Sequence, residues 1–190
     1  LVAVGTRGPV AGRVSAVRIE LTNWELSTTV PIAAGPALSY KAPSVVIDAF
    51  SGPPAFPQKV NTASMIDVLR ASLEYFAAST ANAITIPKLT ATVTPRPSGE
   101  PSFAIGTAEY TYTDLALREI RNGHIGTISA ARSTFTSDPA VPDLGSFAGA
   151  MAQFSLVDFD IGALLAMFDP SNAKTDTYLP MYKQVSAGPF

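Results

Sequence analysis

Polar and apolar residues alternate with a period of two along much of this chain, and this alternation constrains its fold more than any other feature. Within residues 13–21, every second residue from Val17 to Leu21 is apolar and the residues between them are polar. This pattern is typical of a β-strand with one buried and one exposed face. The alternation changes phase at Asn23, after which Trp24 is apolar, and this shift predicts a bulge or bend near Asn23.

Prolines divide the following segment. Short strands are expected at residues 30–32, 38–40 and 44–47. Because proline has no N–H group to donate to a neighbouring strand, Pro43 should confine these strands to sheet edges or strand ends. The proline-rich stretch at residues 51–60 is the best candidate for an internal break.

The spacing of apolar residues then changes to that of a helix. Apolar side chains recur at Met65, Leu69, Leu73 and Phe76. This stripe predicts one main amphipathic helix over residues 62–79. Near the end of the chain, Asp160 should cap a short helix that Asp169 and Pro170 terminate. A further helical turn is expected near residues 176–184, where Pro180 limits its length.

Alternation returns between these helices, in residues 84–93, 103–113 and 147–159. Asn122-Gly123 is a strong signal for a tight hairpin turn, and its return strand should run from His124 toward Phe135. Successive strands joined by tight turns predict a β-rich α+β fold. We expect a twisted antiparallel sheet, of meander or sandwich type, with the main helix packed on it and short helices near the C-terminus.

Composition narrows the class of protein. The chain has 190 residues, which we expect to form a single domain over residues 1–190. Only 15% of its residues are charged, its net charge is −2 and its pI is about 5.3, which argues against a nucleic-acid partner. It has no Cys and one His, so thiol chemistry, disulfides and His-rich metal sites are excluded. The longest apolar stretch is interrupted by Asp158 and Asp160, so we expect no transmembrane segment.

Three motifs suggest chemistry, and each has a structural explanation. His124 follows a hairpin turn and has no nucleophile near it in the sequence. Ser171 and Lys174 match an acylating Ser-x-x-Lys pair, but they follow Pro170 in an expected loop. The Asp158–Asp160 segment resembles the start of a calcium loop without its later ligands. We therefore assign no catalytic, metal-binding or cofactor-binding residue.

Aromatic residues occur in nearly every expected element. They can fill a core, line an apolar pocket between sheet and helix, or form a surface that is covered in an oligomer. The candidate pocket residues are Phe76, Tyr110, Tyr112, Phe154 and Phe168.

Several segments from residue 62 onward resemble those of a known group of proteins. They are Tyr110-Thr111-Tyr112-Thr113-Asp114-Leu115, Ile120-Arg121-Asn122-Gly123-His124-Ile125, Phe168-Asp169-Pro170-Ser171-Asn172, Asp176-Thr177-Tyr178 and Ser186-Ala187-Gly188-Pro189. In these segments, about the last two-thirds of the chain resembles a family of uncharacterised, exported proteobacterial proteins built from β-meanders. The resemblance implies a periplasmic or envelope setting, and it implies no established activity and no catalytic residues.

The leading expectation is a non-enzymatic bacterial module that works outside the cytoplasm. It would bind an apolar, lipid-like small molecule or an envelope protein, and it could form a homo-oligomer. The alternative is a structural assembly subunit, such as a viral coat or surface-layer protein. A third reading is a hydrolase that uses His124 or Ser171.

Overall fold

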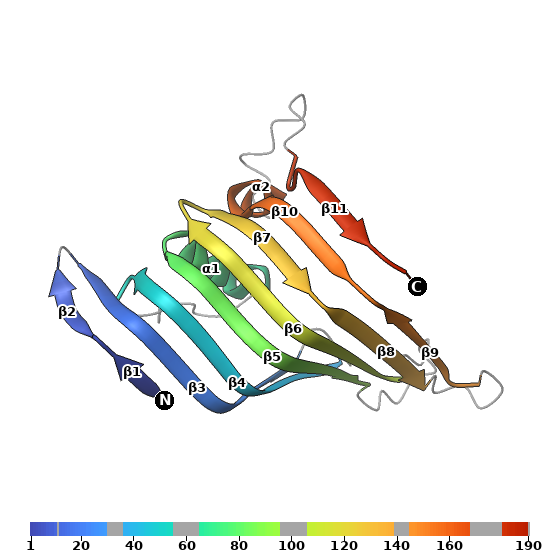
Figure 1. Ribbon diagram of the computed structural model, residues 1–190. Coiled ribbons are helices and arrows are strands. Elements are labelled where there is room, and N and C mark those ends of the chain that lie inside the picture. The colour runs from blue at the N-terminus through green and yellow to red at the C-terminus, as the bar shows by residue number, and fades with distance from the viewer. Residues whose placement is uncertain are drawn as a thin grey trace.

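One sheet of antiparallel strands forms most of the computed structural model, which describes residues 1–10, 12–29, 36–54, 65–95, 106–138, 145–167 and 180–189 (Figure 1). The strands are β1 (Val2–Val4), β2 (Arg7–Val10), β3 (Arg13–Thr29), β4 (Ala37–Gly52), β5 (Ala81–Thr94), β6 (Thr107–Arg121), β7 (His124–Ala130), β8 (Arg132–Asp138), β9 (Phe147–Met151), β10 (Phe154–Asp160) and β11 (Gln184–Ala187). The helices are α1 (Met65–Ala77) and α2 (Ile161–Met167). No helix in this described part of the chain is long and apolar enough to cross a membrane.

The main strands lie beside one another in the order in which they occur in the sequence. From β3 to β6 each strand pairs with the next, β6 pairs with both β7 and β8, and β10 pairs with β7 and β11. β8 continues the line of β7 after a break at Ala131. β10 likewise continues the line of β9 after a break at Ala152 and Gln153. The predicted β-rich antiparallel sheet is therefore confirmed, and of the two types expected, meander or sandwich, the described strands form one open meander.

The predicted hairpin at Asn122-Gly123 is confirmed. Arg121 pairs with His124, and the two residues between them have φ angles of 53° and 77°. Positive φ at both central residues is the requirement of the two-residue type I′ turn. The carbonyl of Gly123 also accepts a hydrogen bond from the N–H of Ile161 at 2.8 Å, so this turn holds the start of α2 against the sheet.

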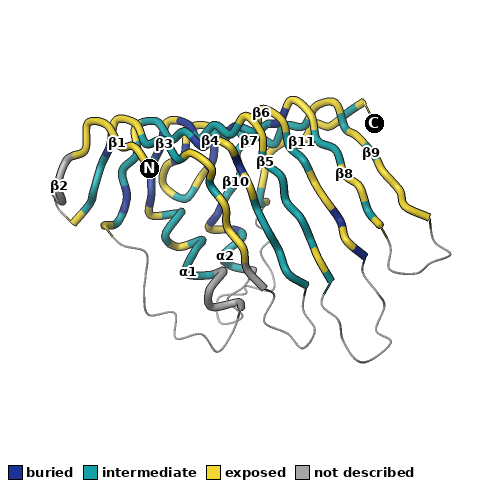
Figure 2. The backbone as a smooth tube through the Cα atoms, turned by 90° about the horizontal axis from the view of Figure 1, so that it is seen from below, coloured by how far each residue is buried: buried dark blue, intermediate teal, exposed yellow. Residues whose placement is uncertain are grey.

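Both helices lie on the same face of the sheet, which we call the helix face (Figure 2). The most buried cluster of apolar side chains joins β5, β6, β7 and α2. It consists of Ala81, Ile120, Ile125 and Ile161. Leu73 and Phe76 of α1 pack against this cluster, so the core lies at the end of the sheet where β6 turns into β7.

The prediction of one main amphipathic helix over residues 62–79 is wrong. Two short helices occur in the described residues, and α1 has only 13 residues. α1 ends because the chain turns back to the sheet: Ser79 donates its backbone N–H to the Phe76 carbonyl (3.0 Å) and its hydroxyl to the Tyr75 carbonyl (2.8 Å). Thr80 then forms a bridge with Ser51 at the end of β4.

The predicted cap of the short second helix is confirmed. Asp160 Oδ1 accepts a hydrogen bond from the N–H of Ala163 at 3.1 Å, at the start of α2. The helical turn predicted over residues 176–184 is wrong at its end, because Gln184 begins β11. Residues 176–179 lie outside the described part of the chain, as do most of the residues 51–60 at which an internal break is expected.

The long strands do not alternate regularly throughout. Leu117 and Ile120 of β6 both pack in the core although they are three positions apart, and Glu119 between them has a φ of 56°. In a regular strand, residues three apart face opposite sides of the sheet. The left-handed residue thus adds one position to the strand, so apolar side chains stay on the helix face on both sides of it.

Similar irregular positions occur in the neighbouring strands and line up across the sheet. We call this line the first crease. By register it contains Gly5, Val17, Ala49, Asn82, Glu119, Gly126 and Asp158. Every second member, namely Gly5, Ala49, Glu119 and Asp158, has a φ between 53° and 64°. Because all of these strands are interrupted at the same level, the pairing register is the same on both sides of the crease.

A second crease crosses the sheet farther from the helices. Asn23, with a φ of 51°, lies opposite Pro43, and Asp114, also with a φ of 51°, lies opposite Pro87 and Ala131. The irregularity predicted at Asn23 is therefore confirmed.

The prediction that Pro43 restricts strands to edges or ends is wrong. The two short strands expected around it form the single strand β4 inside the sheet, while residues 30–32 lie outside the described part. Pairing of β4 with β5 stops at Lys41 and resumes at Val46. A proline is tolerated in this gap because no ladder hydrogen bond there requires its missing N–H group.

Candidate functional site

Beyond the second crease, the helix face continues as an apolar surface. On β6, Tyr112, Asp114 and Leu115 repeat the arrangement of Leu117, Glu119 and Ile120, with the left-handed residue in the same place. Tyr112 therefore lies on the same face as Leu115. Tyr110 follows on that face because residues two apart in a strand share a face.

Strand pairing extends this surface across the sheet. We call a line of residues that pair with one another across successive strands a row. The row of Tyr110 contains its partners Ala91 of β5 and Phe135 of β8, and it continues to Tyr40, Leu26 and Gly149. The rows on either side of it are mostly apolar and include Ser133 in one row and Thr28 and Ser137 in the other. We define the aromatic surface as the large apolar side chains of these rows: Trp24, Leu26, Leu38, Tyr40, Leu89, Val93, Tyr110, Tyr112, Phe135, Phe147 and Met151.

Three aromatic rings meet on this surface near the edge of the sheet. The centroids of Tyr110 and Phe135 are 6.4 Å apart in a stacked arrangement, and those of Phe135 and Phe147 are 5.9 Å apart, edge to face. The ring of Phe135 lies over Gly149, where an added Cβ would approach it to 2.3 Å. Even so, Phe147 is 57% exposed and Leu26 is 48% exposed, so these side chains lack the cover that the core has.

The two faces of this part of the sheet differ in charge. The opposite face carries Thr and Ser residues and an ion pair between Lys41 Nζ and Glu25 Oε1 at 3.1 Å. No charged residue occurs in the described rows of the aromatic surface. With strand spacings of about 4.8 Å and a rise of about 3.4 Å per residue, this surface measures roughly 24 Å across the strands and 14 Å along them.

The structure brings together only part of the pocket expected from sequence. Tyr110 and Tyr112 lie side by side on the aromatic surface. Phe76 belongs to α1 and packs in the core, so it is separated from them by the second crease. Phe154, in β10, is half-buried between Ala130 and Ala187, and Phe168 lies outside the described residues.

Sequence reasoning missed most of the aromatic surface, including Phe135 and Phe147. The signal was present in the alternation of Leu89, Tyr110 and Tyr112 with threonines. Without the pairing register, however, that alternation does not say which strands share a face.

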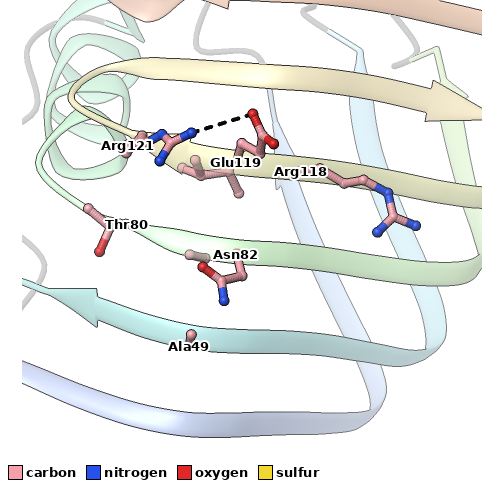
Figure 3. Close-up of a pocket in the computed structure, with 8 residues that line it drawn as sticks. Ala49, Thr80, Asn82, Arg118, Glu119 and Arg121 are labelled. Atoms are coloured by element: carbon pink, nitrogen blue, oxygen red, sulfur yellow. Dashed lines mark ion pairs between the residues drawn. The ribbon is translucent and has the colours of Figure 1, made fainter.

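A polar hollow of about 590 Å³ lies elsewhere, along the first crease on the face opposite the helices (Figure 3). Its floor is made of small residues, including Ala49 and Ala81, and its rim carries Arg118, Glu119 and Arg121. Arg121 Nη2 lies 3.5 Å from Glu119 Oε2, and both side chains are 67% exposed. Such exposed pairs contribute little energy, and the open rim leaves a bound molecule in contact with water. The hollow therefore does not shield a bound molecule from water, as a catalytic site usually does.

Other charged groups on this face are also exposed. Asp158 Oδ2 lies 3.1 Å from Lys183 Nζ, and its Oδ1 lies 3.7 Å from His124 Nδ1. Arg18 bonds Glu20 at 2.7 Å, and this hydrogen bond is the main reason that the pKa of Arg18 is raised. In the part of the chain that the structure describes, no group of three or more His, Cys, Asp or Glu residues could hold a metal ion. Ser171 and Lys174 lie outside it.

No protein-family model, curated protein or solved structure matches this chain. The class of site therefore follows from its own residues: an uncharged aromatic and aliphatic surface on an open antiparallel sheet. The resemblance to exported proteobacterial proteins remains a prediction.

Proposed function

We propose that this chain is a non-enzymatic binding module whose aromatic surface holds an apolar, lipid-like ligand. The observation that carries the proposal is the position of this surface. It continues the helix face beyond the region that α1 and α2 cover, and large apolar side chains such as Leu26 and Phe147 remain exposed on it. Apolar patches of this extent mark binding sites more often than they mark inert surface.

A ligand with acyl chains suits this surface best. Its estimated length of roughly 24 Å exceeds the ~15 Å of one leaflet of a bilayer's hydrocarbon core, so an extended chain can lie along it. The absence of charge in its described rows favours methylene groups over a charged peptide. The hydroxyl groups of Tyr40, Tyr110 and Tyr112 provide hydrogen-bond partners for a polar end of the ligand.

We also propose a bacterial, extracytoplasmic setting. Its support is the low proportion of charged residues and the resemblance of residues 62–190 to exported proteins. Fractionation of the source cells with an antibody against this chain tests the setting, and recovery in the cytoplasmic fraction alone would contradict it.

The only Trp of the chain, Trp24, belongs to the aromatic surface and makes the ligand proposal testable. A long-chain fatty acid that carries a quenching group should reduce Trp24 fluorescence in a saturable way. Phe135→Lys should weaken this binding by about tenfold or more, because burying one large apolar side chain is worth about 1.5–3 kcal/mol.

Thr136→Lys is the matched control, because Thr136 is exposed on the opposite face of the same strand. It introduces the same charge at the neighbouring position and should leave binding unchanged. Equal losses in the two variants, or no saturable quenching in the unmodified chain, would contradict the proposal. Native mass spectrometry of the gently purified chain should also reveal ligand mass that disappears on denaturation.

A further inference from the structure

The edge of the sheet at β9 is unusually open to pairing. β9 pairs with β8 on one side, and no strand in the described residues pairs with its other side (Figure 1). Its sequence, Phe-Ala-Gly-Ala-Met, contains no charge and no proline. Natural sheets usually protect an edge with such residues, because unpaired backbone N–H and C=O groups recruit other strands.

The neighbouring edge strand shows the contrast. β11 follows Lys183 and carries the polar residues Gln184 and Ser186, and it covers β10 from Phe154 to Val157. Beyond β11, Gly188 donates a hydrogen bond to the Gln153 carbonyl and Pro189 accepts one from the Ala152 N–H, so the described chain follows this edge up to the residue after β9 but does not pair with β9 itself. The open edge is therefore confined to a five-residue strand that lacks the polar side chains of β11.

The sequence of β9 is nearly symmetric about Gly149, with a large residue at each end and small residues between. If a second β9 is placed antiparallel with Gly149 facing Gly149, then Phe147 lies opposite Met151 of the other copy, twice. Contacts between methionine sulfur and aromatic rings are favourable. An interface in which the same residues of two copies face each other is the type that closes a two-fold dimer.

The aromatic surface also reaches this edge. Phe147 lies on the helix face and packs edge to face on Phe135. Pairing through β9 would therefore join the two aromatic surfaces into one continuous apolar surface. This continuity favours a second copy as the occupant, because a copy continues the ladder, the apolar rows and the near-symmetric sequence of β9 together.

We propose that the chain forms a two-fold dimer by antiparallel pairing of β9 with β9 of a second copy. This proposal goes beyond ligand binding and does not depend on it, because it concerns the backbone edge and can hold whether or not the aromatic surface takes a lipid. On the face opposite the aromatic surface, Ala148 of each copy then lies beside Ala150 of the other.

Charge placed at these two positions tests the register. Both residues are exposed, so substitution there should not disturb the monomer. Ala148→Lys with Ala150→Lys should weaken the dimer by about tenfold or more, because two like-charged pairs then face each other. The same holds for Ala148→Glu with Ala150→Glu, whereas a mixture of the two variants should form a heterodimer. Sedimentation velocity over a range of concentrations measures each state.

Single cysteines provide a second measurement, because the chain has no Cys of its own. Chains with Ala148→Cys mixed with chains carrying Ala150→Cys should form a disulfide readily, since directly opposed residues lie within reach of one. Neither variant alone should cross-link comparably. A wild-type chain that stays monomeric at all concentrations, or charged variants that dimerise as well as wild type, would overturn the proposal. Cysteine pairs that cross-link without this preference would overturn the register.

Discussion

At the first crease, the size of single side chains decides whether two neighbouring strands can pair closely. Glu119 has a left-handed backbone there, and Gly126 lies opposite it on β7. A Cβ added at Gly126 would lie 2.9 Å from the Cβ of Glu119. Gly126 itself does not have a positive φ, so it is required for the space it leaves and not for its conformational freedom.

Gly126→Ala should therefore lower the free energy of unfolding by about 1–3 kcal/mol, the usual cost of an overpacked position. Gly145→Ala is the matched control, since its added methyl meets nothing within 4 Å, and it should leave stability nearly unchanged. Adding Glu119→Gly to Gly126→Ala should restore much of the loss, because it removes the opposing Cβ and the left-handed strain together. Urea denaturation measures all three. No rescue by the second substitution would contradict this explanation.

At the scale of elements, the junction between β10 and α2 connects the sheet to its cover. Asp160 is the last residue of β10, where it pairs with His124, and its carboxylate also caps α2. Ile161 follows directly and is 1% exposed, the most buried large side chain that the structure describes. One residue thus ends a strand, starts a helix and positions the centre of the core.

Asp160→Ala should cost about 1 kcal/mol of stability, a typical loss for an N-cap. Asp160→Asn should cost much less, because asparagine caps a helix about as well as aspartate. Thermal unfolding followed by circular dichroism distinguishes the two variants. If alanine and asparagine have the same effect, the cap is not what Asp160 contributes.

At the scale of the whole molecule, the sheet has two parts with different support. On the side of the helices, β7 and β10 pack against the core cluster. Beyond the second crease, β8 and β9 continue the same paths without a residue in that cluster. The strands are hydrogen-bonded in both parts, so the difference between them is one of apolar packing.

Native-state hydrogen exchange should therefore distinguish β7 from β8, although both pair with β6. Amides of β8 should exchange through local openings of lower free energy, because few buried apolar contacts hold that region closed. Binding of a long-chain fatty acid should protect β8 more than β7. Equal protection of the two strands in the free chain would show that the sheet opens as one unit.

The sequence by itself determined the features that depend on a few neighbouring residues. The turn at Asn122-Gly123, the irregularity at Asn23 and the cap at Asp160 all follow from local backbone preferences or from hydrogen bonds within one turn. The one-sided burial predicted for residues 17–21 is wrong at Val17, which lies in the first crease and is 68% exposed. These features were enough to predict a β-rich antiparallel sheet, but not whether it is a meander or a sandwich.

Only the tertiary structure decided how these pieces combine. It joins two expected strands across Pro43, because neighbouring strands share a gap in their pairing there. It also separates Phe76 from Tyr110 and brings Leu26 into the same row as Phe135, more than one hundred positions away in the sequence. The physical reason is that register is a property of paired strands. The alternation within one strand determines which of its residues share a face, but only pairing with its neighbours determines which face of the sheet that is and which residues lie beside them.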